Sequence, residues 1–131
     1  MIKSHFFGRE CFIDRELSNH DDLERNLKLL QWQFEKINFV SQIHSNQVLV
    51  IDSEKKIQPR QGLAKADAIV TNLKNLAIAV VTADCGAIIL QDQKHEVVAS
   101  VHAGWRGAKS GIIENSLQQM LNLGAKKENI S

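Results

Sequence analysis

Apolar residues recur at two spacings along the chain, and the change of spacing predicts where helix gives way to strand. The N-terminal part predicts an amphipathic helix, because four apolar residues fall at helical intervals: Leu23, Leu27, Leu30 and Phe34. Asn19 or Asp21 stands where such a helix is capped. Two short strands are predicted next, over residues 37–42 and 47–51, with a turn around Ser45 and Asn46.

The middle of the chain is dominated by strands. A polar stretch over residues 52–65, which holds the single proline Pro59, predicts a loop. Four strands are then predicted, over residues 67–71, 76–82, 86–90 and 96–101. Several of these are continuous apolar runs, which is typical of strands covered on both faces.

A second helix is predicted to begin near Ser110, after Gly107, and to end at Gly124, which is a plausible C-terminal cap. Its apolar face consists of Ile112, Ile113, Leu117, Met120 and Leu121. The order helix, strands, helix predicts a mixed α/β layered sandwich, with residues 1–131 forming one domain. Two helices cover these strands thinly. We therefore expect a missing C-terminal half, a homo-oligomer, or another partner that buries the remaining surface.

Composition narrows the class of protein. The chain has 131 residues, 44% hydrophobic and 24% charged, with a formal net charge of +1, the balance of an ordinary globular protein. That charge gives no reason to expect nucleic acid as a partner. The apolar stretch over residues 76–90 is too short to span a bilayer and is interrupted by Thr82 and Asp84, so we expect no membrane association. Two cysteines and no signal peptide predict a cytoplasmic location.

Three segments hold the candidate chemistry, and each lies at the C-terminal end of a predicted strand: residues 41–44, 82–85 and 101–107. If these ends converge, His44, Cys85 and His102 form a His-Cys-His set. Three protein ligands with one open tetrahedral position are typical of catalytic zinc. A multicopper oxidase needs many more histidines than the five in this chain, so copper is disfavoured.

Other interpretations of these residues stay open. A cysteine after an apolar strand is often buried as a small hydrophobic group. Without metal, Cys85 could be a nucleophile with His102 as its base, as in cysteine hydrolases. Asp84 could orient a ligating histidine or transfer a proton, or could be a turn residue at a strand end.

Residues 102–107 allow two interpretations. Gly104 and Gly107 bracket Trp105 and Arg106 between a strand and a helix. In the functional interpretation, the glycines let the backbone approach a ligand, and Arg106 with the free N–H groups of the helix start binds phosphate. In the structural one, the segment is a tight turn with Trp105 packed on the core and Arg106 in solvent.

Together these segments resemble the laccase-domain, or polyphenol oxidase-like, family. The matching stretches are residues 39–44, 66–71, 81–85 with 88–92, and the unbroken His-Ala-Gly-Trp-Arg-Gly at 102–107. The resemblance implies a layered mixed α/β sandwich, and it implies metal ligands at His44, Cys85 and His102. It also departs from the family's pattern, because Gly86 stands where a proline often follows the cysteine.

The better-supported members of that family are purine nucleoside phosphorylases. The resemblance therefore implies phosphorolysis of adenosine and inosine to the base and ribose 1-phosphate, with zinc as cofactor. Some members also deaminate adenosine. With these substrates, Cys85, His102, Asp84 and Arg106 are the expected catalytic residues. Family members also have a C-terminal half that is absent here, so a non-catalytic relative that binds a partner is a further expectation.

Overall fold

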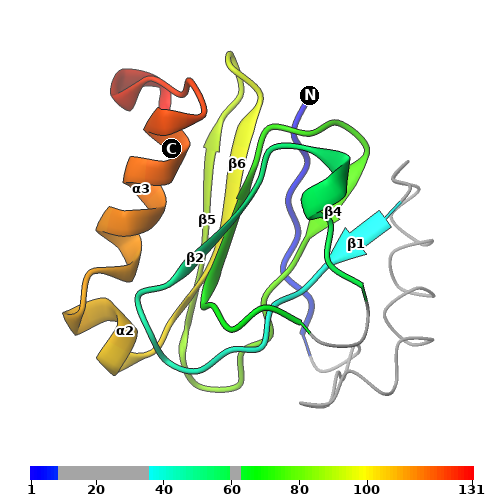
Figure 1. Cartoon of the computed structure of the whole chain (residues 1–131). Helices are drawn as coiled ribbons and strands as arrows, with labels where there is room; N and C mark the ends of the chain where they lie inside the picture. The colour runs from blue at the N-terminus through cyan, green and yellow to red at the C-terminus, as the bar shows by residue number, and fades with distance from the viewer. Residues whose placement is uncertain (9–35, 60–62) are drawn as a thin grey trace.

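The computed structural model describes residues 1–8, 36–59 and 63–131 of the chain. Figure 1 shows a sheet at the centre, with helices on one side and a smaller pair of strands on the other. The predicted helix over residues 23–34 and Cys11 lie outside the described residues. The mixed α/β class predicted from the sequence is confirmed.

The central sheet has four strands in the order β2-β3-β6-β5. Its strands are β2 (Val48–Ile51), β3 (Ala68–Thr71), β5 (Gly86–Asp92) and β6 (Val97–Ala103). β2 runs parallel to β3, whereas β6 runs antiparallel to both β3 and β5. β3 and most of β6 are buried, as their continuous apolar sequences predict.

A second sheet of two parallel strands, β1 (Lys36–Asn38) and β4 (Leu76–Ile78), lies against the central sheet. The 3-10 turn η1 (Glu54–Lys56) lies within the predicted polar loop, and a second such turn, η2 (Lys127–Asn129), follows the last helix. Two apolar clusters separate these layers. Ile51 and Ile69 belong to the cluster on the β1–β4 side, and Val70 and Val101 belong to the cluster on the helix side.

Two helices cover the other face of the central sheet, α2 (Trp105–Lys109) and α3 (Ile112–Asn122). α3 ends with a glycine in the left-handed conformation, Gly124, whose φ is 101°. The N–H of Gly124 donates to the carbonyl of Leu121, and the N–H of Ala125 donates to that of Met120. This is the Schellman arrangement, so the predicted C-terminal cap is confirmed.

A buried carboxylate, Asp92 at the end of β5, ties the segment after α3 to the sheet. It accepts hydrogen bonds from the backbone N–H groups of Lys94, His95 and Lys126 and from Nδ1 of His95, at 2.7–3.0 Å. Burial raises the pKa of Asp92, but the hydrogen bonds from Lys126 and His95 outweigh burial and bring the pKa down to about 2.

The strand predicted over residues 76–82 is shorter in the structure, because β4 ends at Ile78. Beyond Ile78, the side-chain amide of Gln42 forms hydrogen bonds with the backbone of Val81. Gln42 accepts a hydrogen bond from the N–H of Val81 and donates one to its carbonyl, at 2.8 and 2.7 Å. A glutamine side chain therefore satisfies backbone groups that a neighbouring strand would otherwise bind.

The structure corrects two further predictions. A helix, α2, already begins at Trp105, before the predicted start near Ser110. Leu121 was assigned to the apolar face of the second helix, yet it is 37% exposed, while Met120 beside it is fully buried. The hydrophobic face of α3 is thus narrower than the sequence indicates. Among the described residues, no helix is long and apolar enough to cross a membrane.

We predict that Met120→Ala destabilises the protein by about 2–5 kcal/mol, because it leaves a cavity between α3 and the central sheet. Leu121→Ala is the matched control on the next residue and should change the free energy of unfolding by less than about 1 kcal/mol. Urea unfolding followed by circular dichroism measures both. Equal losses from the two variants would contradict the packing of α3.

Candidate metal centre

Three candidate ligands from distant parts of the chain meet at one edge of the central sheet. One donor atom each of His44, Cys85 and His102 lies within 4.8 Å of the other two. His102 lies near the C-terminal end of β6, and Cys85 directly precedes β5. Because β5 and β6 are antiparallel, with Gly86 opposite Ala103, the start of one strand meets the end of the other.

The sequence predicts each of the three segments at the C-terminal end of a strand, and in the structure this holds only for the segment that contains His102. His44 lies in a turn between β1 and β2, and Cys85 lies at the N-terminal end of β5. The prediction assumed parallel strands, whose carboxyl ends share an edge. In an antiparallel pair, opposite ends share it.

The turn that presents His44 has an uncommon backbone. His44 adopts a φ of 59°, in the left-handed region that residues other than glycine rarely occupy. The carboxylate of Asp67 accepts hydrogen bonds from three consecutive N–H groups of this turn: Ile43 at 3.3 Å, His44 at 2.9 Å and Ser45 at 2.6 Å. Asn46 donates to the carbonyl of Ser110 at 2.8 Å, which connects the turn to the helices.

The ring of His102 is buried and directed by the same carboxylate. Its Nδ1 lies 2.9 Å from Oδ1 of Asp67, and since a carboxylate only accepts, Nδ1 carries the proton. This leaves Nε2 as the donor for a metal when the ring is neutral. Burial raises the pKa of Asp67, but the hydrogen bonds from His102, Ser45 and His44 outweigh burial and hold the pKa below its ordinary value.

Cys85 contacts a histidine on one side and a carboxylate on the other. Its Sγ lies 3.8 Å from Nε2 of His44 and 3.8 Å from Oδ1 of Asp84. Burial and the negative charges of Asp84 and Asp67 raise the pKa of the Cys85 thiol. In the metal-free protein the sulfur is therefore a poor nucleophile at neutral pH.

Two glycines allow the segments to approach one another closely. A Cβ on Gly104 would lie 2.8 Å from Cδ2 of His44 and 3.3 Å from Sγ of Cys85. A Cβ on Gly107 would lie 2.7 Å from the carbonyl oxygen of Ser45. The glycines of the His-Ala-Gly-Trp-Arg-Gly segment thus serve close packing around the candidate ligands.

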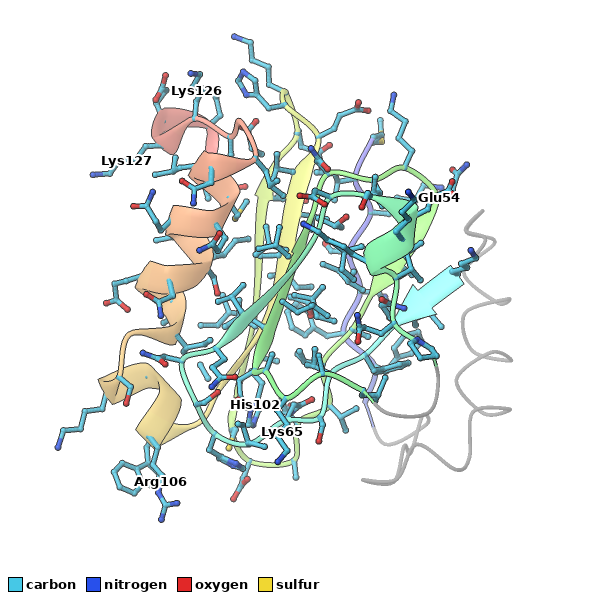
Figure 2. All side chains as sticks on the ribbon, viewed as in Figure 1. Glu54, Lys65, His102, Arg106, Lys126 and Lys127 are labelled. Carbon is cyan, nitrogen blue, oxygen red and sulfur yellow. The ribbon has the colours of Figure 1, made fainter. Side chains whose placement is uncertain are left out.

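Trp105 and Arg106 do not join the three candidate ligands. Trp105 is 72% exposed, so the expectation that it packs on the core is wrong. The Arg106 guanidinium lies 5.3 Å from the centre of the Trp105 ring. Figure 2 shows Arg106 at the foot of α2, pointing into solvent and away from His102. Residues 105–107 begin the helix α2. The structural interpretation is therefore confirmed for Arg106, which lies in solvent, and wrong for Trp105, while phosphate binding by Arg106 stays a prediction.

The donor set fits a divalent metal of intermediate softness. Zinc binds imidazole nitrogen and cysteine sulfur at about 2.0–2.3 Å, which places tetrahedral donors about 3.5 Å apart. The Cys85–His44 separation of 3.8 Å is close to that value. The rings of His44 and His102 meet edge to face, with centres 4.9 Å apart. A tetrahedral zinc ion held by these three donors would keep a fourth position for water or substrate, and His44 is exposed to solvent.

Asp67, which links two of these ligands, is not among the site residues that the sequence predicts. The sequence predicts Asp67 as the first residue of the strand over residues 67–71 and as part of the matching stretch over residues 66–71, and it gives the role of orienting a ligating histidine to Asp84. The structure gives that contact to Asp67, which is fully buried, while Asp84 lies beside the sulfur. The available signal was an acidic residue at the start of an apolar strand, where burial requires partners.

A family described as multi-copper polyphenol oxidoreductase laccase matches residues 13–131. The chain belongs to this laccase family. Two relatives named purine nucleoside phosphorylase come from Corynebacterium glutamicum, 42% identical over 96 residues, and Aquifex aeolicus, 45% identical over 86 residues. The resemblance stated from the sequence is confirmed.

Two solved structures have the same fold as this chain. A Neisseria meningitidis protein superimposes with a TM-score of 0.60 and 34% identity over 78% of this chain and 40% of its own. A hypothetical protein of Bacillus licheniformis superimposes with a TM-score of 0.73 over 88% and 45% of the two chains. The matches to the Corynebacterium and Aquifex relatives cover 73% and 66% of this chain and 38% of each relative. This laccase-family chain thus spans about two fifths of these relatives.

We predict that Asp84→Asn makes Cys85 of the metal-free protein more reactive. Removing the adjacent charge lowers the thiol pKa, so a larger fraction is thiolate at a given pH and the rate–pH profile shifts to lower pH. The rate of Cys85 alkylation is measured with iodoacetamide from pH 7 to 9. Peptide mass spectrometry separates the labelling of Cys85 from that of Cys11. Glu114→Gln is a remote charge control, and an unchanged profile for Asp84→Asn would contradict the assignment.

We also predict that Gly104→Ala weakens metal binding on the order of 10-fold or more, because the new Cβ displaces the His44 ring. Trp105→Ala, on the next residue, removes an exposed ring and should leave the affinity unchanged. Zinc competition with a chromophoric chelator gives both constants. If the two variants bind zinc equally well, Gly104 is not required for the ligand arrangement.

Proposed function

We propose that this chain carries the metal centre of a zinc-dependent purine nucleoside phosphorylase. The observation that carries the proposal is the meeting of His44, Cys85 and His102 within 4.8 Å at an edge of the sheet that is open to solvent. Nitrogen and sulfur donors favour zinc, and the open fourth position is typical of catalytic rather than structural sites.

The names of the relatives support the choice of reaction. Several relatives at 31–45% identity are named purine nucleoside phosphorylase. By that likeness, the substrates of this site are a purine nucleoside and phosphate. In the reaction, a phosphate oxygen forms the bond to C1′ of the ribose while the bond from C1′ to the base breaks. The proton of the phosphate ends on the departing base, and the products are the base and ribose 1-phosphate.

Each residue has a distinct role in this proposal. His44, Cys85 and His102 would hold the zinc ion, which would supply stabilisation of negative charge when bound. Asp84 is exposed next to the sulfur, where its carboxylate is accessible to substrate and solvent for proton transfer. The positively charged guanidinium of Arg106 binds the phosphate. To reach a phosphate at the metal centre, the Arg106 side chain has to leave its contact with the Trp105 ring.

The geometry disfavours the metal-free cysteine hydrolase considered from the sequence. That interpretation makes His102 the base for Cys85, yet the ring nitrogen in contact with the sulfur is Nε2 of His44, at 3.8 Å. Burial and two carboxylates also raise the pKa of the Cys85 thiol, opposite to the shift that an activated nucleophile needs.

The test is turnover by the purified, zinc-loaded chain. With inosine and phosphate we expect hypoxanthine and ribose 1-phosphate, detected by liquid chromatography and mass spectrometry. Cys85→Ser should lower zinc affinity and turnover on the order of 100-fold or more, since a lost ligand costs more than a lost partner of a ligand. Leu121→Ala, on exposed α3 surface, is the control that keeps both.

Parallel arms separate the alternatives. Adenosine as substrate yields adenine by phosphorolysis and inosine by deamination, and omission of phosphate exposes hydrolysis through release of free ribose. Turnover that survives a chelator would favour the cysteine hydrolase. Light scattering reports whether the chain is a monomer or a homo-oligomer. A folded, zinc-loaded chain that releases no base from either nucleoside would refute catalysis by this chain alone.

A further inference from the structure

We propose that Asp67 is the positioning residue of the metal centre: one carboxylate fixes both histidine ligands, although it binds no metal itself. The inference rests on the metal site of the proposed function, not on the identity of the nucleoside. It is carried by the contacts of a single fully buried side chain. The acidic residue selected from the sequence for such a role, Asp84, makes none of these contacts with the histidines.

The first group of contacts shapes the turn that carries His44. Oδ2 of Asp67 accepts from the N–H of Ser45 at 2.6 Å and from its hydroxyl at 2.7 Å, and Oδ1 accepts from the N–H of His44 at 2.9 Å. These N–H groups point to one spot because the backbone of His44 is left-handed. The carboxylate thereby stabilises a backbone conformation that residues other than glycine rarely adopt.

The second group fixes His102. Oδ1 of Asp67 binds Nδ1 of the ring at 2.9 Å, and the carbonyl of Asp67 accepts from the N–H of His102 at 2.7 Å. Asp67 precedes β3, and the pairing of Ala68 with Val101 sets it directly opposite His102. The backbone thus fixes the position of His102, and the carboxylate fixes which nitrogen of its ring faces the ligand cluster.

Charge balance gives the same residue a further effect. A divalent cation and the Cys85 thiolate leave one positive charge, and the Asp67 carboxylate offsets it through the His102 ring. A carboxylate partner also makes an imidazole a stronger donor, and removal of such partners typically costs 10–100-fold in metal affinity. Asp67 therefore acts on the strength of binding as well as on geometry.

The chain contains a matched comparison at the other end of β5. Asp92 is equally buried and binds Nδ1 of His95 at 2.7 Å together with three backbone N–H groups. It lies seven residues from Cys85, about 23 Å along an extended strand. Asp92→Asn thus removes the same kind of buried carboxylate–histidine pair without touching the ligand cluster.

The experiment compares zinc affinity and cobalt spectra of the full chain with those of Asp67→Asn and Asp92→Asn. We expect 10–100-fold weaker zinc binding for Asp67→Asn in chelator competition and wild-type affinity, within twofold, for Asp92→Asn. Both variants should unfold at lower urea concentration than wild type. With Co²⁺, Asp67→Asn should keep the thiolate charge-transfer band of Cys85 but shift the visible bands, because His102 no longer holds its orientation.

The outcomes are decisive. Zinc affinity of Asp67→Asn within twofold of wild type, or an equal loss in both variants, overturns the proposal, as does a wild-type chain that binds no zinc. If zinc binds and responds to Asp67→Asn as expected but no nucleoside is turned over, the positioning role stands and the proposed reaction fails.

A measurement on the unmodified protein covers the case in which Asp67→Asn does not fold. Long-range ¹H–¹⁵N spectra of the metal-free chain, labelled at histidine, report which ring nitrogen carries the proton. The His102 signals are assigned by their loss in His102→Gln. A proton on Nδ1 and a lone pair on Nε2 support the proposal, whereas the opposite tautomer overturns it.

Discussion

The structure around the candidate metal centre depends on the need to satisfy one buried carboxylate. A lone charge in the protein interior costs several kcal/mol, so Asp67 is tolerable only if donors surround it. The donors come from two segments that are remote in sequence, the turn around His44 and the ring of His102. The hydrogen bonds that satisfy Asp67 bring the two candidate ligands His44 and His102 close together. The need to pair a buried charge thus also arranges the candidate metal site.

The sheet supplies the third ligand by a different route. The place of Cys85 follows from the antiparallel pairing of β5 with β6. Gly104 then allows the sulfur and the His44 ring to approach where any larger residue would intrude. Hydrogen bonds to Asp67 position the two histidines, whereas the register of β5 against β6 positions Cys85. A substitution of Asp67 therefore disturbs the histidines and not the strand pairing that positions the cysteine.

The sequence predicts what local pattern controls. The strands of the central sheet and the C-terminal cap at Gly124 follow from apolar runs and from glycine's access to positive φ. The shortening of β4 does not, because it depends on Gln42, a side chain 39 residues from Val81. Leu121 fits the helical period yet faces solvent, since the period says nothing about how wide a surface the sheet offers α3.

The sequence predicts which residues form the candidate site, but it does not predict the contacts that hold them together. Residue chemistry selected His44, Cys85 and His102, whereas their approach and the role of Asp67 required the tertiary pairing of β3 with β6. The matches to relatives named purine nucleoside phosphorylase cover about two fifths of each relative. Metal binding and nucleoside recognition are therefore separable questions here: the first depends on contacts within the described residues, and the second depends on surface that metal affinity does not report.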